Sequence, residues 1–291
     1  MGVKGISPCF LLKPLTIKDM AREISVVIVT HNSQEVLGFC LECLGNQSTP
    51  PSQVVIIDSG SDDTTYLLEF AKQDTYATHL TDNIGYAAAN NLGLSLTDSS
   101  TDFVLVINPD TFLDNTFLEA AARTLEQRSE VAVLTGMLRG YDIQHKRKTG
   151  LLDSTGIFRT WYGRWYDRGQ GEVEGDIYLA EEYVPAICGA LMFIRAEAIA
   201  PERPEVFDQA FFMYKEDIDL SIRLRKRGWK LLYMPEIKAF HCRGWQKKRR
   251  AIDKNTRLLA ARNEIRLYMK HPSLYLIWAA TKYAFVRYGN V

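Results

Sequence analysis

A run of apolar residues that ends in a carboxylate constrains the fold of this chain most strongly. Val104-Leu105-Val106-Ile107 contains three β-branched residues and is followed at once by Asn108-Pro109-Asp110. Such a run is typical of a strand buried on both faces of a parallel sheet. The strand would deliver Asp110 to the carboxyl edge of the sheet, where open α/β sheets bind ligands. The alternative is that Asp110 only caps the helix that follows, because Asp is a common N-cap residue.

Further apolar runs alternate with segments of helical spacing. The runs predict strands at 24–30, 54–57, 77–80, 131–135, 188–194, 229–234 and 237–240. The helical spacing predicts helices at 34–44, 115–127, 216–227 and 251–270. This alternation, with short connections, predicts an α/β fold with a doubly wound, mainly parallel sheet. The turn after the first strand, His31-Asn32-Ser33, contains no glycine, which excludes the dinucleotide fingerprint of a dehydrogenase.

Polar, turn-forming segments follow several of the predicted strands. Asp58-Ser59-Gly60-Ser61 comes after the second strand, and Asn83-Ile84-Gly85 comes after the third. Small residues at 87–89 predict a helix that packs closely against a ligand or against the sheet. These loops would meet at the same edge as Asp110, since a doubly wound fold gathers them there.

Two later segments also carry candidate chemistry. Glu216, Asp217 and Asp219 begin a predicted helix, where acids complement the helix dipole, but three acids in four residues are more than capping requires. Asp217 or Glu216 could act as a general base. His241 follows the last predicted strand and could be a metal ligand, a phosphate contact or a hydrogen-bonded structural residue.

Residues 139–183 lack a sustained period and are rich in aromatic residues. Trp161, Tyr162, Trp165 and Tyr166 fall in this segment. A long aperiodic insertion in a compact domain is typical of a functional loop. Exposed aromatic rings suit a carbohydrate site, and a small satellite core is the alternative.

The C-terminal segment is basic and partly apolar. Residues 241–291 hold twelve Lys or Arg against two acids, a net charge of +10, so the first 240 residues carry −10 because the total is zero. This asymmetry favours an anionic partner such as a membrane surface, or else a solvated basic face. Residues 274–286 are apolar nearly all round but too short to span a bilayer, which suits an interfacial helix or a homodimer seam. No nucleic-acid-binding module is evident, and we expect no nucleic-acid partner.

The cysteines indicate a reducing compartment. Five scattered Cys form no metal-like set, and Cys40 and Cys43 fall within a predicted helix rather than at the turn a redox pair needs. We expect free thiols in the cytoplasm. Phe10-Leu11-Leu12 is too short for the apolar core of a secretory signal.

In order and together, these segments resemble the motif series of family-2 inverting glycosyltransferases. The nearest branch is the rhamnosyltransferase-like enzymes of bacterial surface polysaccharide assembly, and the resemblance covers about residues 24–245. It implies a GT-A fold at 24–245, with a nucleotide-sugar half at 24–115 and an acceptor and catalytic half at 116–245. Residues 1–23 are then an N-terminal extension, and 246–291 a basic amphipathic helical tail.

The resemblance also implies residue roles. Asp217 would be the catalytic base with Glu216 beside it, and Asp110 and His241 would bind Mg²⁺ or Mn²⁺. The implied donor-binding residues are Thr30, Asn32, Asp58, Gly60, Asn83, Gly85, Asn90, Asn108 and Asp110. The implied acceptor-binding residues are Gly189, Ala190, Tyr214, Trp161 and Trp165.

The implied activity is inverting transfer of a sugar from a dTDP- or UDP-sugar, with dTDP-rhamnose the best guess. The acceptor would be a hydroxyl of a glycan or lipid-linked glycan at the inner face of the cytoplasmic membrane. One base suffices, because the leaving diphosphate needs charge stabilisation rather than protonation, whereas a glycosidase needs two opposed carboxylates.

Three positions depart from the family pattern. Asn108 replaces the first acid of D-x-D, Gln209 replaces the Glu of a common Phe-Asp-Glu segment, and Cys242 to Trp245 lack the serine often found there. Asn108 leaves open an inactive glycan-assembly scaffold of the same fold. A sugar nucleotidyltransferase is the other alternative, but it would need a Gly- and Arg-rich loop where Thr30-His31-Asn32-Ser33 stands.

Overall fold

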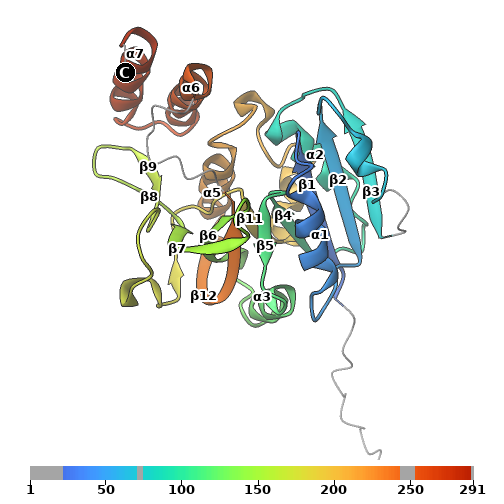
Figure 1. Cartoon of the computed structure of the whole chain (residues 1–291). Helices are drawn as coiled ribbons and strands as arrows, with labels where there is room; N and C mark the ends of the chain where they lie inside the picture. The colour runs from blue at the N-terminus through green and yellow to red at the C-terminus, as the bar shows by residue number, and fades with distance from the viewer. Residues whose placement is uncertain (1–21, 71–74, 243–252, 290–291) are drawn as a thin grey trace, which may run out of the picture.

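The computed structural model describes residues 22–70, 75–242 and 253–289. One large sheet has helices on both faces, and two C-terminal helices pack together near one end (Figure 1). The strands are β1 (Ile24–Thr30), β2 (Gln53–Ser59), β3 (Tyr76–Thr81), β4 (Phe103–Ile107), β5 (Thr111–Leu113), β6 (Val131–Asp142), β7 (Arg147–Ser154), β8 (Ile157–Arg159), β9 (Trp165–Asp167), β10 (Glu182–Tyr183), β11 (Leu191–Arg195) and β12 (Lys230–His241). The α-helices are α1 (Leu37–Gly45), α2 (Tyr86–Ser95), α3 (Phe117–Gln127), α4 (Ala196–Ile199), α5 (Glu216–Lys226), α6 (Lys254–Lys270) and α7 (Leu276–Tyr288).

The sheet has a parallel half and a mixed half. Its order is β10-β12-β6-β11-β4-β1-β2-β3, in which β4, β1, β2 and β3 are all parallel. β11 lies antiparallel between β4 and β6, and β12 runs parallel to β6. The predicted α/β fold is confirmed. The reversed direction of β11 was not predicted, because a buried apolar run reads the same for either strand direction.

Both faces of the sheet are buried. Val26 and Ile28 of β1 belong to a core that also contains residues of α1 and α3, whereas Val27 packs in a second core with residues of α2 and α5. A Cβ at Gly93 of α2 would lie 2.4 Å from Val27 Cγ1, so only glycine allows this approach. The predicted close packing of this helix is therefore confirmed, and it is made at Gly93 against the sheet.

Strand β12 contains a bulge that the sequence predicted as a break between two strands. Met234 pairs with Gly136 and Lys238 with the next residue, Met137, so residues 235–237 have no partner on β6. A Cβ at Gly136 would lie 2.3 Å from the Ile237 carbonyl oxygen. After the bulge, β12 pairs with β5, and His241 lies opposite Thr111.

The segment 139–183 is more regular than predicted. β6 continues to Asp142 and pairs with β7, and β8 and β9 form a hairpin. Trp161, in the turn of that hairpin, is 86% exposed as predicted. The predicted exposure is wrong for Trp165, which is 7% exposed and packs in the main core. Trp165 thus packs in the main core and not in the small satellite core that was the alternative interpretation, whereas its neighbour Tyr166 is exposed.

The two C-terminal helices join the domain. Leu267 and Tyr268 of α6 and Ala279 of α7 belong to the main core, and Lys282 forms an ion pair with the buried Glu264. The outer side of this unit remains apolar, with Leu274, Ile277, Phe285 and Tyr288 all exposed. Within the described ranges no helix combines the length and the apolar character that a membrane crossing requires.

Candidate active site

Asp110 and His241 meet at the edge of the sheet. The β5–β12 pairing brings them together although they are far apart in sequence, and the Cys242 N–H donates to the Asp110 carbonyl at 2.9 Å. His241 Nε2 lies 3.2 Å from Asp110 Oδ1. Asp110 does not cap a helix, because the residues after it form β5. The capping alternative is therefore excluded.

A third residue, Asp153 of β7, fixes the imidazole. His241 Nδ1 lies 2.7 Å from Asp153 Oδ2, and the Asp153 side chain is fully buried. Burial lowers the pKa of His241, but the hydrogen bonds and charges of Asp110 and Asp153 outweigh it and raise the pKa to about 9. In metal sites, a ligating histidine commonly donates its other ring N–H to a carboxylate, which fixes the tautomer.

Asp110 and His241 supply two of the ligands that a metal ion needs. Among the described residues no group of three or more His, Cys, Asp or Glu is arranged to hold a metal ion. Two protein ligands are sufficient for Mg²⁺ or Mn²⁺ where substrate phosphates and water supply the rest. The oxygen of the partly exposed Asp110 and the Nε2 of an imidazole held by Asp153 fit such an ion.

Asp217 lies at the start of α5 and is held by two backbone N–H groups. The Gly189 N–H donates to Oδ2 at 3.0 Å, and the Ile218 N–H donates to Oδ1 at 2.8 Å. The Tyr86 hydroxyl donates to the Gly189 carbonyl at 2.9 Å. The next residue, Ala190, accepts from the Asn108 N–H at 3.1 Å. Asp217 is thereby connected through 189–190 to the segment that carries Asp110.

The two acids Glu216 and Asp217 differ in their contacts. Burial and the adjacent charge of Asp217 raise the pKa of Glu216 to about 8. Burial also raises the pKa of Asp217, but its bonds from Gly189 and Ile218 and the charge of Lys215 oppose this rise. One carboxyl oxygen of Glu216, Oε2, is buried and has no hydrogen-bond partner. At neutral pH Glu216 therefore keeps its proton, whereas Asp217 is the acid whose charged form receives hydrogen bonds from the backbone.

The turns after β1 and β2 bind each other. Asp58 accepts hydrogen bonds from the Ser61 N–H at 2.9 Å and from the Tyr66 hydroxyl at 3.2 Å. Thr30 Oγ1 lies 2.8 Å from the same Tyr66 hydroxyl. Asn32 pairs with Asp62 through both atoms of its amide, at 3.0 and 2.8 Å. The structure brings Thr30, Asn32 and Asp58 together, and their contact with a nucleotide stays a prediction.

The glycines of the donor half mark close approaches. Gly60 has φ +76°, and a Cβ there would lie 2.6 Å from the Asn83 nitrogen. Gly85 has φ +83°, and a Cβ there would lie 2.4 Å from the Phe212 ring. Asn90 is fully buried, donates to the Tyr86 carbonyl at 2.9 Å and leaves its Oδ1 without a partner. The 83–90 segment therefore adjoins the turn that precedes α5.

Sequence reasoning missed three residues of this region. Asp153 orients His241, Tyr86 binds Gly189, and Asn263 of α6 binds the turn before α5. The first lies in the segment predicted as a loop, and the last in the segment predicted as a separate tail. A single buried polar residue gives no periodic signal, so no pattern could have found them. Tyr214 is exposed within the turn before α5, and Trp161 is exposed in the β8–β9 hairpin turn.

Comparison with known proteins identifies the family. A family model described as glycosyltransferase like family 2 matches residues 21–260. The chain belongs to glycosyltransferase family 2. Among its relatives, the N-acetylglucosaminyl-diphospho-decaprenol L-rhamnosyltransferase of Mycobacterium tuberculosis is 25% identical over 237 residues, which cover 76% of each protein. The rhamnosyltransferase WbbL of Escherichia coli K12 is 21% identical over 229 residues, 75% of this chain and 83% of that protein.

Solved structures that are similar to this chain have the GT-A fold. The structure of GalNAc-T7 with UDP, GalNAc and Mn²⁺ matches 91% of this chain with a TM-score of 0.63 and 14% identity. This chain spans 55% of that longer chain. The mannosyltransferase PcManGT of Pyrobaculum calidifontis, in complex with GDP-Man and Mn²⁺, matches 93% of this chain and 72% of its own, with a TM-score of 0.59 and 16% identity. The predicted GT-A fold and family are confirmed.

Proposed function

We propose that this chain is an inverting hexosyltransferase that moves a sugar from a nucleotide-diphosphate donor to a hydroxyl of a glycan or lipid-linked glycan. The best candidate donor is dTDP-rhamnose, and the pathway is cell-surface polysaccharide synthesis. The observation that carries the proposal is the linkage of Asp217, through Gly189 and Ala190, to the Asn108–Asp110 segment beside His241. The names of the two rhamnosyltransferase relatives support the choice of sugar.

Asp217 is the catalytic base in this proposal. Its two backbone hydrogen bonds leave each oxygen a further lone pair, so the carboxylate is oriented without being used up. Asp217 accepts the proton of the acceptor hydroxyl while that oxygen bonds to the anomeric carbon, and the bond from this carbon to the diphosphate oxygen breaks on the opposite face. Glu216 keeps its own proton at neutral pH and so does not compete for the acceptor proton.

The metal is assigned to Asp110 and His241. Bound there, Mg²⁺ or Mn²⁺ would supply positive charge to the leaving diphosphate. Asn108 in place of the first acid of D-x-D is compatible with this assignment, since Asp153 makes His241 a better oriented ligand. The intact acids and His241 argue against the inactive scaffold.

The acceptor is assigned to the side of Gly189. A Cβ at Gly189 would lie 3.5 Å from the Asp217 Cβ, so glycine leaves room beside the base. Tyr214 and Trp161 remain candidate acceptor contacts because both are exposed. Ala190 contributes its backbone carbonyl, which binds the Asn108 N–H. Trp165 is buried and is therefore no longer a candidate acceptor contact.

A membrane surface is the proposed location of the acceptor. Ile277, Phe285 and Tyr288 form an exposed apolar stripe along α7, and Arg287 lies beside it. A helix with an apolar stripe and basic flanks suits the interface of an anionic bilayer. A homodimer seam is the other occupant that this stripe would accept.

Calorimetry tests the donor site. We would titrate dTDP-rhamnose, UDP-glucose, UDP-galactose and GDP-mannose, with and without Mn²⁺, into the wild type and Asp110→Ala. Metal-dependent binding of one donor that the variant loses supports the proposal. Asp217→Asn is the matched control, because it should keep donor binding and lose turnover. If no donor binds to the wild type, the scaffold becomes the better hypothesis.

A further inference from the structure

The turn at 211–215 has an unusual backbone. Phe212, Tyr214 and Lys215 have φ of 61°, 73° and 79°, in the left-handed region that side chains other than glycine rarely adopt. Lys215 is the residue directly before α5, and its carbonyl accepts the Asp219 N–H at 2.9 Å. The geometry of this turn therefore sets where Glu216 and Asp217 lie. Strained residues of this kind persist only where the surroundings hold them.

One side chain of α6 holds this turn. The Asn263 Nδ2 atom lies 2.6, 2.8 and 3.1 Å from the carbonyl oxygens of Phe211, Met213 and Tyr214, so its two N–H groups are shared among three acceptors. Asn263 is fully buried. Three carbonyl oxygens that converge on one point repel each other, and the partial positive charge of the amide group compensates that repulsion.

A neighbouring arginine fixes the direction of the amide. Arg266 lies three residues after Asn263 on α6. It donates to Asn263 Oδ1 at 3.3 Å and also to the Ala210 carbonyl. Because Oδ1 accepts from Arg266, the NH₂ group must face the turn. The two residues together bind four carbonyls of the segment before α5.

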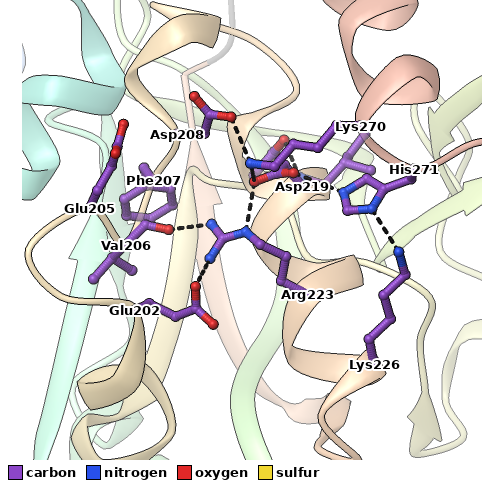
Figure 2. A network of polar contacts seen from close by, with 12 residues as sticks. Glu202, Glu205, Val206, Phe207, Asp208, Asp219, Arg223, Lys226, Lys270 and His271 are labelled. Carbon is purple, nitrogen blue, oxygen red and sulfur yellow. Dashed lines mark hydrogen bonds and ion pairs between the residues drawn. The ribbon is translucent and has the colours of Figure 1, made fainter.

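The end of α6 also binds the first turn of α5. Figure 2 shows Asp219, which is fully buried, between Lys270 and His271. The Lys270 Nζ lies 3.0 Å from Asp219 Oδ2, and the His271 Nε2 lies 2.8 Å from Oδ1. Arg223 donates to the same carboxylate at 2.9 Å. Helix α6 thus contacts the acid-bearing helix both before and after Glu216–Asp217.

The other side of the turn contacts the donor half. The Phe212 carbonyl accepts the Ala87 N–H at 3.0 Å, and the Phe212 ring lies against Gly85. The turn therefore joins α6, the acid pair and the start of α2. A change at Asn263 would act first on the acid pair, because α5 begins directly after the turn.

We propose that helix α6 is part of the active site and that Asn263 is a positioning residue, which holds turn 211–215 and so places the acid pair Glu216–Asp217 for transfer. This inference rests on the proposed function for its catalytic part. The C-terminal segment is then not a separate tail. Asn263 touches no substrate, and it acts through the turn.

The test uses isosteric and matched variants of the full chain. Asn263→Asp keeps the shape but replaces the donor by an oxygen that repels the three carbonyls. Arg266→Gln removes the second contact from a half-buried position. Asn255→Asp makes the same chemical change at an exposed site on the same helix. Asn91→Asp disturbs a buried Asn that pairs instead with the Phe207 backbone, at 2.7 and 2.8 Å.

Two readouts separate positioning from general destabilisation. Hydrogen exchange of the 213–220 amides should rise at least about tenfold in Asn263→Asp, less in Arg266→Gln and not in the two controls. Hydrolysis or transfer with the donor that calorimetry identifies should fall in kcat by about 10²-fold in Asn263→Asp, since a small misplacement of a catalytic group has that effect. The donor Kd should change less than about threefold, because the turns after β1 and β2 are held by Asp62 and Ser61 and not by the 211–215 turn. Asn91→Asp should lower the thermal midpoint and leave kcat unchanged.

A folded Asn263→Asp with the exchange and kcat of Asn255→Asp would overturn the inference, and so would raised exchange with unchanged kcat. If Asn263→Asp does not fold, Arg266→Gln decides by the same two readouts. If the wild type turns over none of the four donors, the proposed function fails, and the exchange comparison alone decides whether Asn263 holds the acid pair.

Discussion

Replacement of Glu216 by glutamine should change the pH dependence of stability. The folded protein keeps a proton on Glu216 up to a pKa of about 8, whereas the ordinary carboxyl value is 4.5. Between these values the folded state binds more protons than the unfolded state, so the free energy of unfolding falls as pH rises. The contribution is fully present below about 4.5 and is lost as pH rises through about 8.

The size of the effect follows from the shift. A rise from 4.5 to about 8, at about 1.36 kcal/mol per unit, corresponds to roughly 5 kcal/mol over the whole range. Between pH 5.5 and 8.5 the wild type should lose roughly 3 kcal/mol relative to Glu216→Gln, because glutamine does not titrate. Glutamine also reproduces the shape of the protonated acid, so at pH 7 the variant should fold and keep most of its turnover.

Urea unfolding at pH 5.5, 7.0 and 8.5, followed by circular dichroism, measures this difference. Glu236→Gln is the control, since Glu236 is exposed on the bulge of β12. The control should run parallel to the wild type across the three pH values. If Glu216→Gln also runs parallel to the wild type, the proton is not held on Glu216 in the folded state. If Glu216→Gln abolishes turnover at pH 7 while Asp217→Asn does not, the roles of the two acids are reversed.

The remaining predictions concern the metal site and the membrane. Asp153→Asn should weaken Mn²⁺-dependent donor binding by about 10- to 100-fold in calorimetry, because His241 loses its orienting carboxylate, and unchanged binding would remove Asp153 from the site. The double variant Ile277→Ser/Phe285→Ser should sediment less with anionic liposomes while its donor Kd stays unchanged. Sedimentation equal to that of the wild type, together with a wild-type dimer that the variant disrupts, would assign the stripe to a homodimer seam.

Much of the fold followed from local patterns. β1 has the predicted bounds at 24–30, and α5 begins at Glu216 as predicted, because a buried strand and a helix with acids in its first turn leave clear signals. The site was predicted from the order of its motifs rather than from periodicity. Asp110 and His241 are adjacent because β5 pairs with β12, and strand pairing over that sequence distance leaves no local pattern.

The remaining features could not be read from the sequence. Asn263 lies in a basic, partly apolar helix whose composition favours a surface role, and only the positive φ values of the turn create the need for its amide. The exposure of Trp165 was wrongly predicted for a related reason, since an aromatic residue of the main core and one at a sugar site give the same signal in the sequence. The role of such residues depends on contacts between segments that are far apart in the chain. These contacts leave no pattern in any short stretch of the sequence.

The bulge of β12 has a consequence for the tolerance of this protein to mutation. Gly136 pairs with Met234, before the bulge, and not with His241. Because Gly136 has no side chain, the Ile237 carbonyl can approach it, and residues 235–237 of β12 can bulge out without pairing with β6. The pairings Ala239 with Leu138 and His241 with Gly140 follow from that count. A methyl group at position 136, or one residue fewer in 235–237, would shift the ladder and carry the imidazole away from Asp110, whereas exposed Glu236 can vary freely in chemistry. The position of His241 is thus determined by the number of residues in the bulge and by the absence of a side chain at Gly136. The spacing in this segment should therefore be under tighter constraint than its residue types.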